Sequence, residues 1–138
     1  MRLRKDAKIQ QMQRVPLFAA CSKRELAEIA SIADEIDLPE GRALTREGQG
    51  GHEFFVLLEG TAEVRRKGRK VDTLESGDFA GELALIMKRP RNATITTTSP
   101  VRLLVVTEQN FRGLLRHQPG IHLKVTQAAL ERVAPESV

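Results

Sequence analysis

The pattern of hydrophobic and polar positions divides the 138-residue chain into a helical region, a β-rich region and a second helical region. In the first region, Ser22 and Glu25 have the spacing of a capping box, and apolar residues then recur at helical spacing up to Ile36. Pro39 and Gly41 interrupt this spacing. We therefore predict an amphipathic helix that stops before them.

Short apolar runs separated by glycine-rich turns follow as far as about residue 106. Five of these runs predict strands: FFVLL (54–58), AEV (62–64), VDTL (71–74), ATITT (93–97) and VRLLVV (101–106). No interval between them is long enough for a crossover helix, which favours antiparallel pairing. We expect a mainly β domain with flanking helices, folded as a sandwich, a jelly roll or a barrel.

Helical spacing returns after Thr107, which is a predicted N-cap. The QPG at 118–120 separates a first helix from a second one that runs from Ile121 to about Val133. The second helix has two apolar rows, one formed by Ile121, Val125 and Ala128 and the other by Leu123, Leu130 and Val133. Since a helix that packs on one side of its own domain needs one row, the second row either widens the core face or covers a ligand or a partner subunit.

Length and composition fit one globular domain, because 41% hydrophobic residues in a chain of this size supply one core. No apolar run approaches the roughly 18 residues of a membrane span, and the N-terminal MRLRKDAKIQQMQR lacks the apolar stretch of a secretory signal. We expect a soluble, cytoplasmic protein without a membrane span. The single cysteine, Cys21, cannot form an internal disulfide.

The formal net charge of +4 comes from 22 basic and 18 acidic residues that are spread along the chain. Nucleic-acid-binding domains usually carry a denser basic footprint, and a chain without Trp or Tyr has only five Phe residues to stack on bases. Residues 1–14 are more basic, and we interpret them as a leader ahead of a domain at 15–138. This leader is either solvated or docks on an acidic partner or a membrane surface.

Catalytic motifs are absent from the sequence, so we expect a protein that is not an enzyme and holds no cofactor and no metal. The three histidines, His52, His117 and His122, have neither H-x-H nor HExxH spacing. Serine and cysteine nucleophile motifs are missing as well. The lack of a Walker loop and of a GxGxxG element argues against a nucleoside triphosphate or dinucleotide fold.

Residues 81–94, GELALIMKRPRNAT, concentrate the candidate chemistry. Gly81 permits close backbone approach, and the free N–H groups at the start of the short helical turn after it make an anion site. The planar donors of Arg91 suit two phosphate oxygens. Glu82 would repel a phosphate unless it accepts a hydroxyl proton from the same ligand, as a nucleotide sugar would provide. The alternative is that Glu82 and Arg91 pair with each other.

The same run resembles the phosphate-binding cassette of cyclic nucleotide-binding domains, which is written F-G-E-L/M-A-L, a short variable piece, then P-R-x-A-T/S. Here it reads A-G-E-L-A-L, IMKR, P-R-N-A-T. Upstream, LPEGRALTREGQGGHEFFVLLEGTAEV resembles the opening strands of that family, and VPLF at 15–18 with the helix after it resembles its N-terminal helical segment. The resemblance covers residues 15 to 133, with several motifs in matching order.

The resemblance implies an eight-stranded β-roll that binds a cyclic nucleotide as a regulatory sensor. Glu82 would bind the ribose 2′-hydroxyl and Arg91 the cyclic phosphate, with backbone N–H groups completing the cradle. The implied ligand-binding residues are Gly81, Glu82, Leu83, Ala84, Arg91, Asn92 and Ala93. The final helix would close over the base, and ALER at 129–132, which resembles the closing helix of prokaryotic potassium-channel domains, makes Leu130 and Arg132 the lid contacts, unless Arg132 is simply solvated.

Three positions depart from the family pattern. Ala80 replaces the common aromatic residue before Gly81, and His52 stands where the family usually has an acid. Asn92 occupies the position where a hydroxyl residue tends to favour cGMP and a small alanine is typical of cAMP-selective members. We expect cAMP rather than cGMP as the ligand.

Two further functions stay open. The β-roll can serve as an interaction or homodimerisation module that does not bind nucleotide. It can also be the regulatory fragment of a larger channel or enzyme, with an effector protein or an attached domain as its partner. The chain ends at Val138, which leaves no room for the helix-turn-helix of the transcription factors in this family, so no DNA-binding domain is expected.

Overall fold

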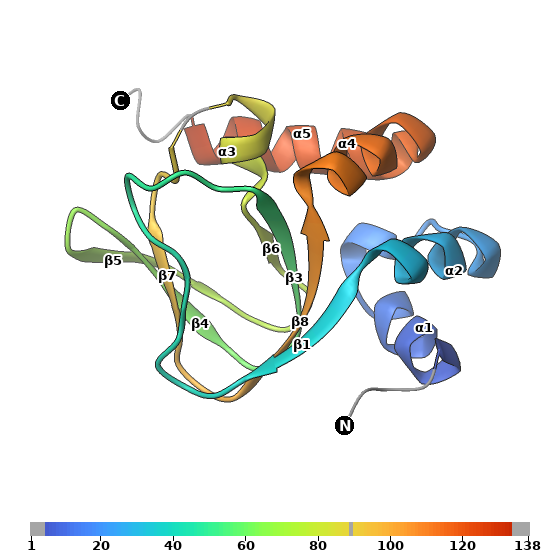
Figure 1. The fold of residues 1–138 in the computed structure, drawn as a ribbon, viewed down its shortest axis with the longest axis horizontal. Helices are drawn as coiled ribbons and strands as arrows, with labels where there is room; N and C mark the ends of the chain where they lie inside the picture. The colour runs from blue at the N-terminus through green and yellow to red at the C-terminus, as the bar shows by residue number, and fades with distance from the viewer. Residues whose placement is uncertain (1–4, 89, 134–138) are drawn as a thin grey trace.

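The computed structural model describes residues 5–88 and 90–133 (Figure 1). Three helical segments open the chain, α1 (Lys5–Gln13), the 3-10 helix η1 (Pro16–Phe18) and α2 (Lys23–Ile32). Eight strands follow: β1 (Asp34–Leu38), β2 (Ala43–Thr45), β3 (Glu53–Glu59), β4 (Ala62–Arg66), β5 (Arg69–Leu74), β6 (Phe79–Ala80), β7 (Thr94–Thr97) and β8 (Val101–Thr107). A short helix, α3 (Glu82–Ile86), lies between β6 and β7, and α4 (Glu108–His117) and α5 (Pro119–Val133) follow β8.

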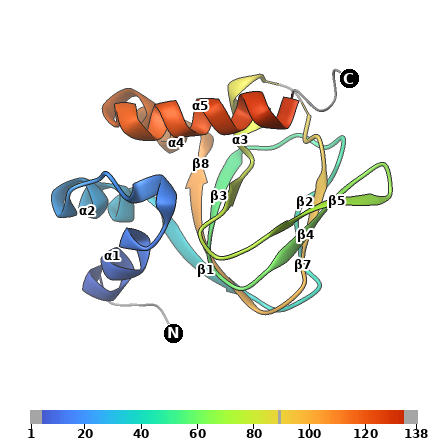
Figure 2. The same ribbon diagram turned by 180° about the vertical axis from the view of Figure 1, so that it is seen from behind.

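The strands form two four-stranded sheets with the orders β1-β8-β3-β6 and β2-β7-β4-β5. Every pairing in both sheets is antiparallel. The two sheets face each other as a roll, and α4 and α5 lie across one end of it (Figure 2). The predicted mainly β fold with flanking helices is therefore confirmed.

Strand β3 is buried on both faces, which explains why its sequence is an unbroken apolar run rather than an alternating one. Phe54, Val56 and Leu58 belong to the core between the first sheet and the helices. Phe55 and Leu57 point the other way, into the core between the two sheets. The strand thus joins the helical layer to the interior of the roll.

Helix α2 begins with the predicted capping box: the Glu25 N–H donates to Ser22 Oγ at 3.1 Å, and the Ser22 N–H donates to Glu25 Oε1 at 2.8 Å. The predicted end of this helix is wrong, because α2 stops at Ile32 and Ile36 lies in β1 opposite Leu103 of β8. The position of Ile36 fits the helical spacing, but every residue of β1 pairs with β8, and this pairing determines the local structure.

Helix α1 packs on the domain, so the expectation of a solvated leader is wrong for residues 5–13. Met12 is fully buried in the core with the helices. Lys8 Nζ donates to the carbonyls of Ala30 and Ala33, both at 2.9 Å, and so satisfies carbonyls at the C-terminal end of α2. Residues 1–4, which hold Arg2 and Arg4, lie outside the described part of the chain.

Helix α5 buries one of its two predicted apolar rows. Ile121 and Val125 are in the core, whereas Leu123 is 60% exposed and Leu130 is 66% exposed. The broad core face is therefore excluded as the explanation of the second row in this structure. Within the described residues, no helix has the length and apolar character needed to cross a membrane.

Candidate ligand-binding site

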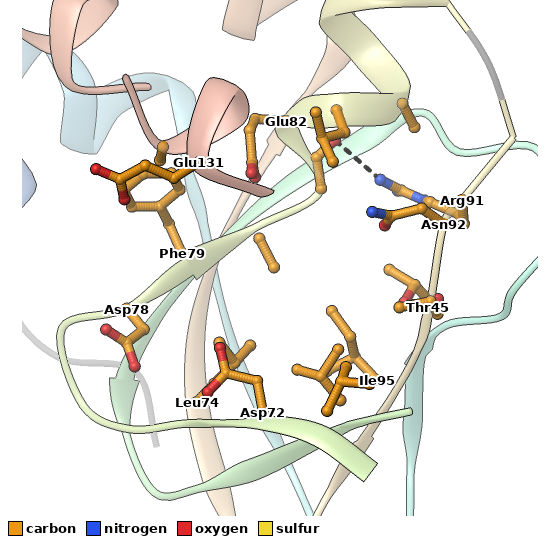
Figure 3. Close-up of a pocket in the computed structure, with 18 of the residues that line it drawn as sticks. Thr45, Asp72, Leu74, Asp78, Phe79, Glu82, Arg91, Asn92, Ile95 and Glu131 are labelled. Carbon is orange, nitrogen blue, oxygen red and sulfur yellow. Dashed lines mark hydrogen bonds between the residues drawn. The ribbon is translucent and has the colours of Figure 1, made fainter. Parts of the chain in front are cut away.

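A cavity of about 630 Å³ lies in the roll, bounded by the inner strands, α3 and α5 (Figure 3). Glu82 and Arg91 border the upper part of this cavity, and Asp72 of β5 borders the lower part. All seven residues predicted to bind the ligand line it, namely Gly81, Glu82, Leu83, Ala84, Arg91, Asn92 and Ala93. The two side chains on which the prediction depends thus meet in one open space.

Gly81 forms the turn from β6 into α3, and this turn requires a glycine. Its φ is 96°, a left-handed value that side chains rarely adopt. A Cβ there would lie 2.7 Å from the Glu53 carbonyl oxygen and 2.8 Å from Arg91 Nη1. The turn sends Glu82 into the interior as the first residue of α3, where it is 1% exposed.

Arg91 is held by main-chain groups. Its Nη1 donates to the carbonyl of Gly81 at 3.1 Å, and its Nη2 donates to the carbonyl of Glu53 at 2.9 Å. Its own N–H donates to the carbonyl of Gln49, and its carbonyl accepts from the N–H of Gly48, both at 2.8 Å. Among the described residues, the hydrogen bonds of the guanidinium go to main-chain carbonyls and not to Glu82.

The guanidinium of Arg91 is buried and also lies near an aromatic ring. The side chain is 7% exposed in relative terms, and its guanidinium carbon is 5.7 Å from the centre of the Phe55 ring. Burial lowers the pKa of Arg91, and the carboxylates of Glu53 and Glu82 act in the opposite direction. Because an arginine pKa lies far above neutrality, the group stays cationic and presents a desolvated positive charge at the cavity.

Gly51 belongs to the site although the sequence marked it only as part of a turn. A Cβ at Gly51 would lie 1.9 Å from Arg91 Nε and 2.1 Å from Arg91 Cζ. The backbone of the loop between β2 and β3 therefore lies directly against the guanidinium. Thr45, at the end of β2, lines the cavity and donates its hydroxyl to the Ala93 carbonyl at 3.0 Å.

The far walls of the cavity come from segments that are distant in sequence. Strands β4 and β5 supply Arg66 and Asp72, and Arg66 Nε donates to the Asn92 carbonyl at 3.2 Å. Helix α5 supplies Lys124 and Glu131. The sequence did not predict that these four residues line the cavity, because no local motif indicates that a hairpin and the last helix reach the same cavity.

Of the two proposed lid contacts, Leu130 does not reach the cavity in this structure. Leu130 lies on the exposed side of α5 and is not among the residues that line the space. Arg132 is in α5, but its side chain lies outside the described part of the structure. Helix α5 is tied to the N-terminal segment instead, because Lys124 Nζ donates to the carbonyl of Pro16 in η1.

The histidines do not gather around the cavity. Within residues 5–88 and 90–133, no group of three His, Cys, Asp or Glu side chains is arranged to hold a metal ion. The side chain of His52 is 83% exposed, and its Nδ1 lies 3.9 Å from Glu108 Oε1. His52, where the resemblance leads us to expect an acid, therefore faces solvent beside Glu108 of α4.

Known proteins resemble this chain in sequence and in fold. The family described as "Cyclic nucleotide-binding domain" matches residues 35–118. A cAMP-dependent protein kinase regulatory subunit of Mycosarcoma maydis is 39% identical over 132 residues, which cover 89% of this chain and 24% of that protein. The structure of cAMP bound PfPKA-R (141-441) has a TM-score of 0.79 at 22% identity and covers 94% of this chain and 47% of that one.

A regulatory subunit of a cAMP-independent protein kinase A from Trypanosoma brucei has a TM-score of 0.84 at 18% identity, over 92% of this chain and 46% of that chain. At such identities the likeness shows the fold alone. Fold, cavity and sequence together define a ligand-binding β-roll of the cyclic-nucleotide type. The chain belongs to the cyclic nucleotide-binding domain family. It spans between about a quarter and a third of the length of the curated relatives it matches.

Proposed function

We propose that this chain is a regulatory sensor that binds cAMP in the cavity between β6, α3 and α5. The observation that carries the proposal is the meeting of two buried side chains of opposite charge, Glu82 and Arg91, at one cavity of about 630 Å³. Arg91 has donors beyond the two that it directs at main-chain carbonyls, and both side chains line the same cavity, so a ligand there meets a positive and a negative group. A cyclic nucleotide matches both groups with its anionic phosphodiester and its ribose hydroxyl.

The phosphate would lie against Arg91 and the start of α3. Arg91 directs two donors at the carbonyls of Gly81 and Glu53, and this fixes the plane in which its remaining donors point. The first N–H groups of a helix have no intrahelical partner, so those of Leu83 and Ala84 are free to complete the cradle. Glu82 then accepts a hydrogen bond from the ribose 2′-hydroxyl.

The preference for cAMP over cGMP rests on Asn92. This residue lines the cavity directly after Arg91 and brings an amide where a hydroxyl residue would favour the guanine base. The relatives whose names mention cAMP support the same choice.

Ligand binding would act on α5. Lys124, Ala128 and Glu131 already border the cavity from this helix, so a nucleotide in the cavity contacts α5 directly. A ligand shifts the position of a helix only by binding one position more tightly than the other. We propose that the occupied cavity draws α5 inward, which brings Leu130 or Arg132 to the base. Backbone chemical shifts of residues 121–133 that stay unchanged at saturation would contradict this movement.

A second candidate is a β-roll that serves as an interaction module without nucleotide. The likeness to a cAMP-independent kinase regulatory subunit favours keeping it, because the same fold there goes with a protein described as independent of cAMP. The chain also spans only part of its relatives, so an attached channel or enzyme, a separate effector protein or a second copy of this chain is proposed as the recipient of the signal.

Titration calorimetry with cAMP, cGMP and 2′-deoxy-cAMP tests the nucleotide proposal. Charge-assisted hydrogen bonds contribute roughly 1.5–3 kcal/mol each, so Arg91→Ala should weaken cAMP binding by about 10²- to 10³-fold or more. Glu82→Gln should weaken cAMP by at least about tenfold and 2′-deoxy-cAMP hardly at all, since the latter lacks the hydroxyl. Equal cAMP affinity in the wild type and the Arg91 variant, or no binding by the wild type, would favour the interaction module.

A further inference from the structure

The hairpin of β4 and β5 carries a concentrated block of positive charge. Residues 65–70 read RRKGRK, with five basic residues and no acidic one. The hairpin extends away from the body of the roll in both views (Figures 1 and 2). Arg65, Lys67, Arg69 and Lys70 are exposed. Charged residues are otherwise spread along the chain, and this tip is where basic residues gather and face solvent.

The register of the hairpin sets like charges opposite each other. Arg65 pairs with Lys70, and Arg66 pairs with Arg69. Like charges at directly opposed positions of an antiparallel pair destabilise it. Arg65 is offset by Glu63, whose Oε1 is 2.7 Å from its Nε. No hydrogen bond or ion pair within the described residues engages the side chains of Lys67, Arg69 and Lys70, so these cations stay available.

Protection of a sheet edge explains only part of this charge. Strand β5 is an edge strand, and charged residues on an edge oppose pairing with another chain. That role accounts for Arg69 and Lys70. It does not account for Arg65 and Arg66, because β4 lies between β7 and β5, nor for Lys67 in the turn. The tip holds more positive charge than edge protection requires.

We propose that the tip of this hairpin docks on an anionic phospholipid surface. The cations are confined to the turn and the two pairs behind it, whereas Glu63 and Asp72 come next along the two strands. Two carboxylates lie closer to the cations than the chain order indicates: Glu47 accepts a hydrogen bond from the Lys67 N–H at 2.9 Å, and Glu63 pairs with Arg65. The exposed side chains of Lys67, Arg69 and Lys70 therefore supply the positive charge that a flat anionic surface would meet.

A nucleic-acid groove fits the same tip less well. A groove that enclosed the two-stranded ribbon would bring its phosphates against Glu63 and Asp72. The hairpin also has no aromatic side chain to stack on bases, and the whole chain has no Trp or Tyr. Val71, which is 50% exposed beside Lys70, adds a small apolar contact that a lipid interface accepts.

The surface site is distinct from the nucleotide site. Arg66, Val71 and Asp72 line the cavity, but Lys67, Arg69 and Lys70 do not. Substitutions at these last three positions therefore test the surface without touching the residues assigned to the nucleotide.

Sedimentation of the full chain with lipid vesicles tests the proposal. At about 0.1 M salt, the wild type should bind phosphatidylcholine vesicles that contain about 30 mol% phosphatidylserine and should not bind pure phosphatidylcholine. Each basic residue near such a surface contributes roughly fivefold in affinity, so the triple variant K67Q/R69Q/K70Q should bind about 100-fold more weakly. The control K23Q/R24Q/R42Q removes three exposed basic residues elsewhere and should keep its binding within a few-fold.

Three results would overturn the proposal. The first is equal sedimentation of the wild type with both kinds of vesicle, and the second is wild-type affinity in the hairpin variant. The third is an equal loss of affinity in the control variant, which would make net charge the cause. A DNA or RNA duplex of about 20 base pairs, measured at the same salt, provides a further arm, and tighter binding to it than to the vesicles would assign the tip to nucleic acid instead. Thermal melting of all three proteins confirms that each is folded, and the hairpin variant should melt at or above the wild-type temperature, since it loses its like-charge pairs.

Discussion

Gly51→Ala tests whether the guanidinium of Arg91 must stay where the structure puts it. The new Cβ would lie 1.9 Å from Arg91 Nε and 2.1 Å from Arg91 Cζ, distances that no pair of such atoms tolerates. Ordinary contact begins at 3.4 Å, so the end of the arginine side chain has to retreat by at least about 1.5 Å. The backbone of Gly51 is not left-handed, and alanine can therefore adopt it without strain.

The displacement separates two effects by size. A retreat of about 1.5 Å ends the hydrogen bonds of Arg91 to Gly81 and Glu53, which are 3.1 and 2.9 Å long. Water takes over as partner of the moved guanidinium, so we expect the fold to lose only about 1–2 kcal/mol, or roughly 3–8 °C in melting temperature. Nucleotide binding should fall by at least about tenfold, because the phosphate loses an aligned charge-assisted donor.

Calorimetric titration with cAMP, together with thermal melting, measures both effects. Gly50→Ala is the matched control, since a Cβ there meets nothing within 4 Å and its backbone is also not left-handed. The double variant G51A/R91A should bind no more weakly than Arg91→Ala alone, because both changes act on the same group. Wild-type affinity in Gly51→Ala, or an equal loss in Gly50→Ala, would refute the reasoning.

Three further outcomes follow from contacts outside the cavity. Arg102→Met should lower the free energy of unfolding by about 2–4 kcal/mol in denaturant titrations, because Arg102 Nε lies 2.8 Å from Asp37 Oδ1 and 3.5 Å from Glu35 Oε1, and the Glu35 side chain is only 4% exposed. The hydrogen bond from Arg102 lowers the pKa of Asp37, so the contribution of this pair to stability is complete above the unfolded pKa of about 3.9 and is lost as the pH falls through the lower folded value. The melting temperature should therefore fall less steeply between neutral and acidic pH in the variant than in the wild type. Ser22→Ala should cost about 1 kcal/mol through loss of the capping box, as read from chemical denaturation. Leu130→Ser should change the free energy of unfolding by no more than about 0.5 kcal/mol, because the Leu130 side chain is exposed. A larger loss of stability, together with a change in gel-filtration volume, would show that a second copy of the chain packs on this face.

The elements that sequence predicted best are those with strong local signals. The apolar run of β3 and the capping box at Ser22 each indicate the local structure from only a few residues. Strands β2 and β6 have three and two residues, which is too short for a period to show. Strand β1 is polar apart from Ile36 and Leu38, and it exists because β8 pairs with all of its residues. Local patterns cannot report such a long-range partner.

The candidate site divides in the same way. The side of the cavity that includes α3 is predictable because Gly81, Glu82 and Arg91 lie on one continuous segment whose spacing carries the resemblance. Its other walls were not predictable, since Asp72 arrives on a hairpin and Glu131 on the last helix. Their positions depend on how the two sheets close and how α5 crosses the end of the roll, which are properties of the assembled fold rather than of any motif.

The acceptors that aim Arg91 are the carbonyl oxygens of Gly81 and Glu53, and a carbonyl is present whatever side chain its residue bears. The aim of the guanidinium is therefore insulated from substitution at positions 52 and 53. Arg91 therefore keeps its two acceptors in a chain that carries a histidine at position 52. A sequence search that demands an acid there would discard chains that hold this arginine by the same main-chain carbonyls.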